Sequence, residues 1–366
     1  MFRFLAVLAS VVMTVPAAAL EVPPKPDGAI RFATFNVYLF GKHPGDVIAR
    51  LEAGETRAEL SAAVIQRVRP DVLLVQEIDR DVAGRALALY ADDYLAVPQG
   101  DEPGIDYPHR LLLPTNTGEP SGVDLSGNGF VGTSGEAYAR DAKGFGFFPG
   151  QYGFSLLSRL PLGEARTLCE VLWAEMPDSR ITVDVSEAAR KVLPVSSKTH
   201  ALIPVDADGV TIHVVAAHPT PPIRSDRNVA RNADEIRLLV DLLDEAESQY
   251  ARDDNGVAGG LPTGSHAVVM GDLNADPAGG NSAPGAIGYL LDNPAVVDPQ
   301  PTSPHAGTKT AAFRSGDKMR VDYVVPTAGL TVLQSGVYWP ADGDPLHGAS
   351  DHYLVWVDVL VPDRSD

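Results

Sequence analysis

Seven polar side chains that can bind a cation or move a proton lie beside apolar runs of the sequence. They are Asn36, Glu77, His218, Asp272, Asn274, Asp351 and His352. A single carboxylate next to a strand is usually a turn residue or a helix cap. A group of this size favours a shared site, because a rigid sheet can hold many loops at one edge.

The oxygen donors of this group suit a hard divalent cation. Glu77 and Asn36 offer carboxylate and amide oxygens, which fit Mg²⁺, Mn²⁺ or Ca²⁺ rather than zinc, and Asp351 is a further candidate ligand. The alternatives are a surface carboxylate for Glu77 and a turn residue for Asn36. We predict a divalent-metal cofactor, with Mg²⁺ as the favoured ion.

The histidines and the remaining acids suit the hydrolysis of a phosphoester, which needs an activated water and neutralised phosphate oxygens. His352 is a candidate general base, and Asp322 would hold its imidazole in the correct tautomer. Asp272 and Asn274, two residues apart in an extended segment, would point the same way. One would position the water or a metal, and the other would donate its amide to the phosphate. His218 would donate a hydrogen bond to the phosphate or protonate the leaving group.

Four further residues are candidates for binding the substrate. Lys198 and His200 precede a predicted strand, and they either face a phosphate or lie on a solvated surface. Arg227 and Asn228 lie at the start of a predicted helix, where backbone amides and the helix dipole favour anions. They would bind a distal phosphate or cap the preceding loop.

The elements that position these residues are short strands interleaved with helices. Apolar runs with few charges predict strands buried on both faces at residues 30–35, 72–75, 154–157, 201–205, 210–217, 266–270, 321–325 and 353–360. Helical periodicity covers residues 57–68 and 228–250, the second with an apolar face that includes Ile236, Leu239 and Leu243. The order predicts a mixed α/β protein.

The motifs taken together resemble the endonuclease/exonuclease/phosphatase family. The resemblance rests on Thr34-Phe-Asn36, Val75-Gln-Glu77, Tyr152-Gly-Phe-Ser-Leu-Leu-Ser-Arg159, Ala217-His218, Gly271-Asp-Leu-Asn274, Val321-Asp-Tyr-Val324 and Ser350-Asp-His352. It implies an α/β fold, a four-layer α-β-β-α sandwich of two packed mixed sheets, with the site at one edge. It also implies metal-dependent hydrolysis, with the roles given above at the matching positions.

A narrower resemblance connects the chain to exported bacterial members of this family. It rests on Ser196-Ser-Lys-Thr-His200, His218-Pro-Thr-Pro-Pro222, residues 226–237 and a Gly-rich stretch over residues 121–151. We expect a single domain over residues 20–366, with a Gly-rich insertion at about residues 115–150 that forms a wall beside the site. The segment Asp124–Gly129 resembles the start of an EF-hand loop, but Gly135 stands where that loop requires Glu.

The N-terminus predicts export. Arg3, an apolar run over residues 4–15 and the small residues Ala17-Ala-Ala19 follow the order of a cleavable signal peptide, residues 1–19. The apolar run is too short for a stable membrane span. We expect a secreted or periplasmic protein without a stable membrane anchor. The alternative is a buried first helix.

The net charge of −19 bears on the partner. Tight binding to DNA depends on clustered Lys and Arg, so we expect a small phosphodiester to be favoured over duplex DNA, and we expect a monomer. Phe145, Phe147 and Phe148 would pack in the core or contact a lipid. The main functional prediction is an exported, metal-dependent phosphodiesterase. The alternatives are a nuclease acting on DNA or RNA and a non-catalytic binding module.

Overall fold

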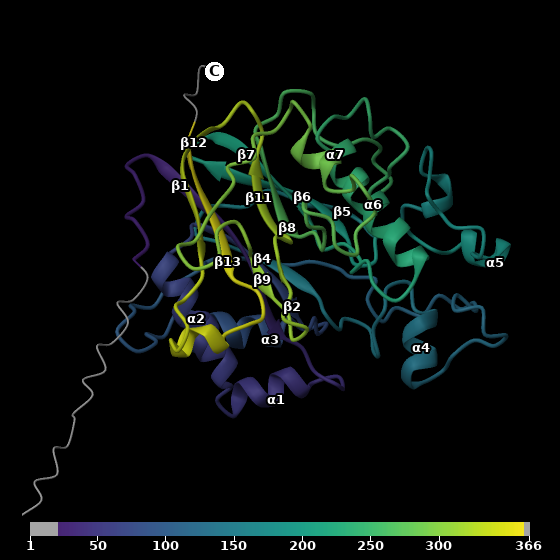
Figure 1. Ribbon diagram of the computed structural model, residues 1–366, viewed down its shortest axis with the longest axis horizontal. Helices are drawn as coiled ribbons and strands as arrows, with labels where there is room; N and C mark the ends of the chain where they lie inside the picture. The colour runs from purple at the N-terminus through teal and green to yellow at the C-terminus, as the bar shows by residue number, and fades with distance from the viewer. Residues whose placement is uncertain (1–20, 362–366) are drawn as a thin grey trace, which may run out of the picture.

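The computed structural model describes residues 21–361 (Figure 1). The predicted signal peptide, residues 1–19, therefore lies outside the described residues. In the part that is described, no helix is long and apolar enough to cross a membrane.

A six-stranded sheet holds one half of the site. Its order is β12-β13-β1-β2-β4-β3. The strands are β1 (Ala29–Leu39), β2 (Val72–Ile78), β3 (His109–Leu112), β4 (Phe154–Ser158), β12 (Thr331–Tyr338) and β13 (Leu354–Leu360). β1 and β2 are parallel and the other neighbours are antiparallel, so the sheet is mixed.

A five-stranded sheet, in the order β11-β8-β7-β6-β5, holds the other half. Its strands are β5 (Arg166–Leu168), β6 (His200–Ala207), β7 (Val210–Ala217), β8 (Ala267–Asp272) and β11 (Asp322–Pro326). Only β7 and β8 are parallel here. A separate hairpin is formed by β9 (Ala311–Ala312) and β10 (Lys318–Met319).

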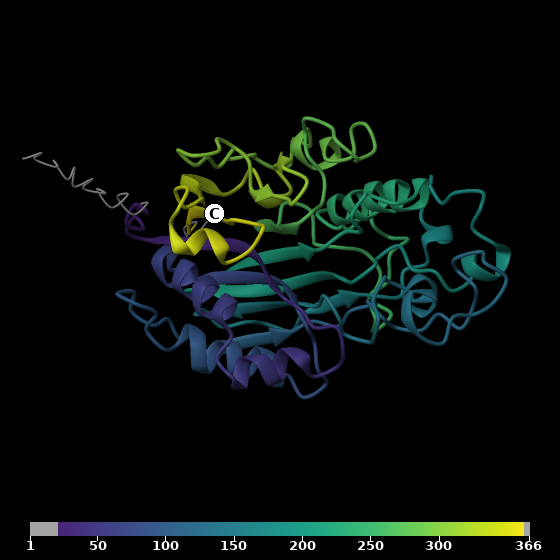
Figure 2. The same cartoon turned by 60° about the horizontal axis from the view of Figure 1, so that its bottom comes forward.

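Helices cover the outer face of each sheet. The α-helices are α1 (Asp46–Glu52), α2 (Thr56–Val68), α3 (Arg85–Leu89), α4 (Gly135–Asp141), α5 (Glu187–Arg190), α6 (Asp226–Asp241) and α7 (Gly288–Leu291). Short turns of other helix types are η1 (Tyr90–Leu95), η2 (Trp173–Glu175) and η3 (Pro345–Gly348). Figure 2 shows the purple α1 and α2 on one side of the stacked sheets and the green α6 on the other.

The alternation of side chains along each strand explains the layers. On β1, Phe32 packs between the two sheets, whereas its neighbour Ala33 belongs to the cluster under α2. On β7, Val214 faces the other sheet and Val215 faces α6. Both faces of both sheets are therefore apolar, and the chain forms the predicted four-layer α-β-β-α sandwich of two mixed sheets.

The predicted elements differ from the structure mainly at their ends. The predicted helix over residues 228–250 is wrong in its second half, because α6 ends at Asp241. There the carbonyl of Leu242 accepts a hydrogen bond from the amide of Leu261 instead of from the next helical turn. Likewise β1 does not end at Phe35 but continues to Leu39, so Asn36 lies inside a strand and not after one.

The Gly-rich insertion is held by its own polar contacts. The carboxylate of Asp124 accepts backbone hydrogen bonds from Gly127, Asn128 and Gly129, which form a closed turn. Of Phe145, Phe147 and Phe148, only Phe148 is buried, so the expected core packing holds for that residue alone. Phe145 and Phe147 remain 40 % and 41 % exposed.

Candidate active site

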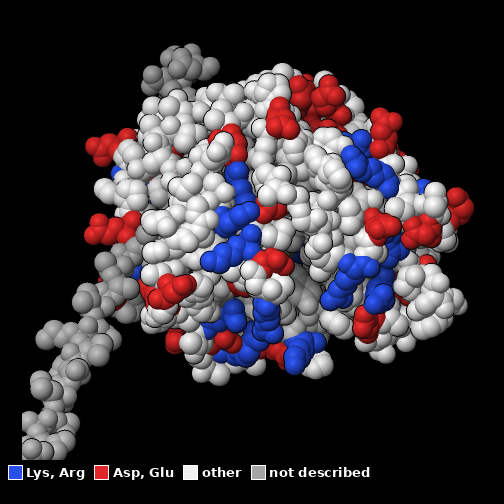
Figure 3. All heavy atoms as spheres, in the orientation of Figure 1, with Lys and Arg blue, Asp and Glu red and all other residues white. Residues whose placement is uncertain are grey.

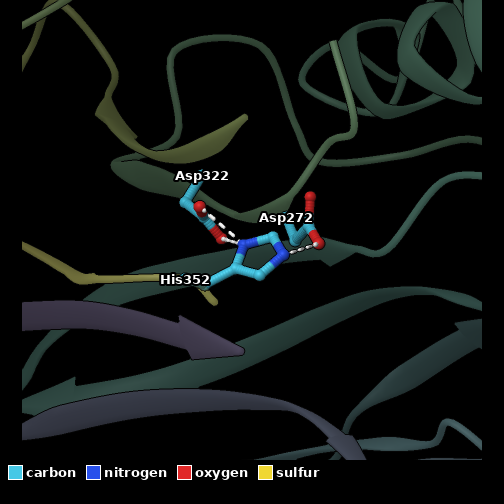
Figure 4. Close-up of side chains that lie close together, drawn as sticks. All are labelled: Asp272, Asp322 and His352. Carbon is cyan, nitrogen blue, oxygen red and sulfur yellow. Dashed lines mark hydrogen bonds and ion pairs between the residues drawn. The ribbon is translucent and has the colours of Figure 1, made fainter. Parts of the chain in front are cut away.

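A buried histidine–aspartate pair lies where β11 begins and the chain approaches β13. His352 Nδ1 is 2.9 Å from Asp322 Oδ2 and 3.1 Å from Asp322 Oδ1 (Figure 4). The hydroxyl of Thr310 donates to Asp322 Oδ2 at 2.8 Å and fixes the carboxylate from the other side. The ring of Phe313 meets the imidazole edge-on at a centroid distance of 5.6 Å. The imidazole is therefore oriented through Nδ1, and Nε2 is left to face the site.

Asp272, the last residue of β8, lies on the Nε2 side of the same imidazole (Figure 4). Asp272 and Asp322 are direct partners in the antiparallel β8–β11 register, which explains why two carboxylates lie so close together. Asp272 Oδ2 is 3.7 Å from His352 Nε2 and 3.5 Å from His218 Nε2. It also accepts a hydrogen bond from Asn36 Nδ2 at 3.2 Å, which links the two sheets.

The charges around His352 set its protonation. Burial alone would lower the pKa of the imidazole, but the carboxylates of Asp322 and Asp272 raise it well above its ordinary value. Burial also raises the pKa of Asp272. By contrast, burial and the nearby cations Lys198 and His352 hold the pKa of His218 well below its ordinary value. His218 is therefore neutral near pH 7.

Asp272, Asp322 and His352 form a buried cluster that could hold a metal ion. Their candidate ligand atoms lie within 4.8 Å of one another. The predicted ligands Asn36, Glu77 and Asp351 lie beside this cluster. Burial raises the pKa of Glu77 above its ordinary value, and the nearby carboxylate of Asp351 adds to this effect. A hydrogen bond from Asn36 opposes it.

Glu77 reaches the site through an irregular turn in β2. Its φ of 57° is left-handed, and the β1–β2 register shifts between Asn36 and Leu39. This kink interrupts the strict alternation of side chains. The sequence offers no glycine at this point, so the strained backbone was not predicted. Strain of this kind at a polar cluster is typical of functional sites.

Lys198 comes from the segment just before β6 and is buried within reach of the same carboxylates. Burial lowers the pKa of its ammonium, while Glu77, Glu235 and Asp272 raise it. No side chain or carbonyl of the described residues hydrogen-bonds this ammonium, although the backbone carbonyl of Lys198 is paired with Asn116. The cation is available to an anion in the site.

His200 does not face the site, and its predicted contact with substrate is not supported. Its Nδ1 lies 2.7 Å from the hydroxyl of Ser196, and its Nε2 lies 2.8 Å from the carbonyl oxygen of Glu235. Both ring nitrogens are thus engaged by the protein, and the residue is only 1 % exposed. Burial lowers the pKa of His200, which keeps it neutral.

Arg227 and Asn228 hold loops at the start of α6. Arg227 Nη1 donates to the carbonyl of Leu125 in the Gly-rich insertion. Asn228 Nδ2 donates to the carbonyl of Ile223 at 2.8 Å. These contacts agree with the second of the two predicted roles, capping of the loop.

Asn274 departs from the extended geometry that was predicted for it. β8 ends at Asp272, and Asn274 has a left-handed φ of 54°. Its Nδ2 donates to the carbonyl of Pro219 at 3.1 Å, and its backbone amide donates to Asp272 Oδ1 at 3.0 Å. The two side chains are therefore not related by strand alternation. Asn274 instead fixes one oxygen of Asp272 and the segment after His218.

Sequence analysis missed two residues that support the site. Glu235 on α6 accepts hydrogen bonds from the amide and hydroxyl of Ser197 and from the amide of Thr220, and so ties together the segments that carry Lys198 and His218. Thr310 orients Asp322 as described. A charged residue at an apolar position of an amphipathic helix could have marked Glu235, but nothing local marks Thr310.

The only cysteine has no part in this chemistry. Cys169 is buried, and its burial raises the pKa of the thiol to about 12. A nucleophilic thiolate is therefore absent near neutral pH.

On the surface, the face that carries the ends of β2 and β8 is hollowed. Figure 3 shows this hollow beside the end of β2, with Lys and Arg side chains gathered on both sides of it. The overall charge of −19 is thus not spread evenly. Local positive charge next to a cleft attracts anionic ligands.

The structure has a buried histidine–carboxylate pair beside oxygen donors, at one edge of two packed sheets. This is the arrangement that the family resemblance implies. Residues 33–352 match the Endonuclease/Exonuclease/phosphatase family, and the chain belongs to that family. No curated protein matches it in sequence.

Solved structures share the fold at low sequence identity. An endonuclease/exonuclease/phosphatase from Beutenbergia cavernae is 20 % identical, with a TM-score of 0.55 over 91 % of this chain and 72 % of that one. A humanized D. rerio TDP2 is 11 % identical, with a TM-score of 0.51 over 92 % of this chain and 100 % of that one. TDP2 from C. elegans is 14 % identical, with a TM-score of 0.50 over 93 % and 77 % of the two chains.

Proposed function

We propose that this protein is an exported, divalent-metal-dependent phosphodiesterase. The observation that carries the proposal is the pair formed by His352 and Asp322, whose free Nε2 faces Asp272 beside the ligands Asn36 and Glu77. A binding module would not need an oriented imidazole between two buried carboxylates, so the pair favours an enzyme over the non-catalytic alternative.

The donor set fits a hard cation. Glu77 and Asp351 supply carboxylate oxygens, and Asp351 Oδ1 is buried without a hydrogen-bond partner. Asn36 Oδ1 accepts from the amide of Tyr38 at 3.2 Å and keeps a second lone pair. A bound divalent cation, for which Mg²⁺ is favoured, supplies neutralisation of the phosphate's charge.

The protein's own groups perform the proton transfer. His352 Nε2 takes a proton from the attacking water, and Asp322 stabilises the imidazolium that forms. The ammonium of Lys198 pairs with an anionic phosphate oxygen. His218 donates a hydrogen bond to the phosphate from its neutral ring, because the low pKa of its imidazolium leaves too little of it near pH 7 to serve as an acid.

A substrate panel tests this proposal and its nearest alternative. The purified protein is assayed with bis(4-nitrophenyl) phosphate, phosphomonoesters, single-stranded RNA and duplex DNA, with and without Mg²⁺. We expect the small diester to be cleaved faster than duplex DNA at physiological salt. The basic side chains beside the hollow favour the nuclease alternative, and a much higher activity on duplex DNA would establish it.

Export is proposed from the N-terminal sequence alone. If residues 1–19 are removed during secretion, N-terminal sequencing of the extracellular or periplasmic protein should start near Leu20. Finding Met1 on the exported protein would contradict the proposal.

A further inference from the structure

Three half-buried aromatic rings form a continuous row next to the site. The centroids of Tyr38 and Phe40 are 4.6 Å apart, and those of Phe40 and Tyr152 are also 4.6 Å apart, with interplanar angles of 58° and 57°. We call these three residues the aromatic row. Tyr38 and Phe40 come from the end of β1 and the residue after it, and Tyr152 comes from the loop before β4.

The aromatic row lies against the metal ligands. Tyr38 follows Asn36 by two residues, and its amide donates to Asn36 Oδ1 at 3.2 Å. Burial and the nearby carboxylate of Glu77 raise the pKa of Tyr152 to about 12. A group held in the row would therefore lie beside the proposed metal ligands.

The two tyrosines of the row differ from the others in the chain. The chain has eleven tyrosines. Nine of them use their hydroxyl in a hydrogen bond to the protein: Tyr90, Tyr94, Tyr107, Tyr138, Tyr250, Tyr289, Tyr323, Tyr338 and Tyr353. Within residues 21–361, the hydroxyls of Tyr38 and Tyr152 make no such bond. The phenol groups without a protein partner are thus the ones beside the metal ligands.

The backbone holds these rings in place at a cost. Tyr38 and Tyr152 both have a left-handed φ of 55°, a conformation that bulky residues rarely adopt. Asp79 ties their two loops together, because its carboxylate accepts from the amide of Gly41 at 2.7 Å and from the amide of Tyr152 at 3.1 Å. Gln151 Nε2 adds a bond to the carbonyl of Gly41 at 2.6 Å. These bonds join the two loops that carry the row.

The rings of the row differ in what packs against them. The guanidinium of Arg57 lies 4.6 Å from the centroid of Tyr38, so this ring is packed between a cation and Phe40. Tyr152 has one ring neighbour, Phe40, among the described residues. Tyr152 therefore lacks the guanidinium cover that Tyr38 has, and it lies half-buried in the neighbourhood of Glu77.

We propose that Tyr38, Phe40 and Tyr152 form a stacking subsite for a planar aromatic group esterified to the phosphate of the substrate. The proposal rests on the proposed function and specifies its substrate class, namely a phosphodiester with one aryl or nucleoside substituent. Stacking on aromatic side chains is tolerant of the ring's identity because every planar ring has a π-face. A half-exposed row of rings would bind an aromatic substituent better than an aliphatic one, because an aliphatic chain has no π-face to stack.

The test compares esters that share one leaving group. We measure kcat/KM for phenyl 4-nitrophenyl phosphate, methyl 4-nitrophenyl phosphate and thymidine 5′-(4-nitrophenyl) phosphate with Mg²⁺. We expect the wild type to prefer the phenyl ester to the methyl ester, after correction for uncatalysed rates. Tyr152→Ala should reduce this preference about tenfold, the size expected for one stacking contact. Tyr152→Phe, which keeps the ring, should preserve the preference.

Further controls separate stacking from damage to the fold. Phe40→Leu should reduce the same preference in part, whereas Phe147→Ala, which removes an exposed ring outside the row, should leave it unchanged. A nucleoside ester preferred over the phenyl ester would identify a nucleotide as the source of the ring, and the reverse order would identify a simple aryl ester. An unchanged preference in Tyr152→Ala would overturn the subsite.

A binding experiment distinguishes failure of the subsite from failure of the proposed function. Calorimetry measures the affinity of phenyl phosphate and methyl phosphate for the wild type and for Tyr152→Ala. Tighter binding of phenyl phosphate to the wild type alone supports the subsite even if no ester is hydrolysed. Equal affinities of the two phosphates for the wild type would overturn the subsite, even if the diesters are cleaved.

Discussion

At the scale of single residues, the imidazole of His352 lies between the carboxylates of Asp322 and Asp272, which contact it in different ways. Asp322 contacts His352 at Nδ1 within hydrogen-bond distance, whereas Asp272 lies 3.7 Å from Nε2. The first geometry orients the ring. The second is too long for a direct hydrogen bond, so Nε2 is not tied to Asp272 and could accept a proton from a water molecule. The two carboxylates together would therefore both position the proposed base and stabilise its charged form.

Replacement of the base should reduce turnover. We expect His352→Ala to lower kcat by about 10²-fold or more, because a positioned proton acceptor contributes that much to hydrolysis. If the ion is held by Asn36, Glu77 and Asp351 and not by the group of Asp272, Asp322 and His352, metal binding should be nearly unchanged. The check is kcat from steady-state kinetics together with Mg²⁺ affinity. A kcat near that of the wild type would remove His352 from the mechanism and leave Asp272 as the better candidate for the base.

Substitution of the orienting carboxylate should change the pH profile. The raised pKa of His352 keeps the imidazole protonated past pH 6.5, so the rate should rise with pH through a limb above that value. Asp322→Asn removes one of the charges that raise this pKa and should move the limb to lower pH, with a lower plateau. If His352 were instead a phosphate-binding cation, activity would fall as pH rises.

The two substitutions should not act independently. Residues that work as a unit show strongly non-additive losses. The double variant of His352→Ala and Asp322→Asn should therefore lose much less activity than the product of the two separate factors. Fully multiplicative losses would show that the two side chains serve different steps.

At the scale of elements, the site depends on close contact between neighbouring strands. Gly271, just before Asp272 on β8, approaches β7 so closely that an added Cβ would lie 2.0 Å from the carbonyl oxygen of Ala217. The obstructing atom belongs to the backbone, which cannot rotate away. A glycine here allows His218 and Asp272, at the ends of β7 and β8, to lie side by side.

Gly271→Ala should therefore both destabilise the protein and impair the site. Overpacking in a core typically costs about 1–3 kcal/mol, and the shift of β8 would displace Asp272 from His352. The measurements are the midpoint of denaturant unfolding and kcat. Gly348→Ala is the matched control, since its added Cβ would meet only Leu60 Cδ1 at 3.6 Å. Equal stability of the two variants would contradict the close-contact explanation.

At the scale of the whole molecule, the two sheets together build the proposed cation site. Asn36 and Glu77 belong to the six-stranded sheet, and Asp272 belongs to the five-stranded sheet. The hydrogen bond from Asn36 to Asp272 crosses between them. A ligand held at this edge would therefore stabilise the packing of one sheet on the other.

Metal should raise stability as well as activity. A chelator should abolish hydrolysis, and Mg²⁺, Mn²⁺ or Ca²⁺ should restore it. A cation at 100 times its Kd should add about 2.7 kcal/mol to the free energy of unfolding, seen as a rise in Tm. Glu77→Gln should weaken this shift, and Glu136→Gln, at an exposed carboxylate on α4, should not. Full activity in the presence of chelator would contradict the metal site.

The sequence by itself determined the local elements and the members of the site. Strand β7 and helix α2 agree with the predicted ranges to within one residue, because their patterns of apolar side chains have a clear period. The residues of the His352 pair and the proposed ligand Glu77 were predicted from polar residues beside apolar runs together with the family resemblance. These features depend on near neighbours in the chain, so they are visible in the sequence.

Tertiary structure alone decided which of the candidates meet and how. Asp272 and Asp322 are 50 positions apart in the chain and become neighbours through the β8–β11 register. His200 was a reasonable candidate from the sequence, but the fold engages its Nδ1 with the hydroxyl of Ser196 and its Nε2 with the carbonyl of Glu235 on α6. The left-handed turns at Tyr38, Glu77 and Tyr152 had no glycine to mark them. Long-range pairing and packing outweigh local preference at such positions, because the free energy gained there comes from residues that the local sequence does not contain.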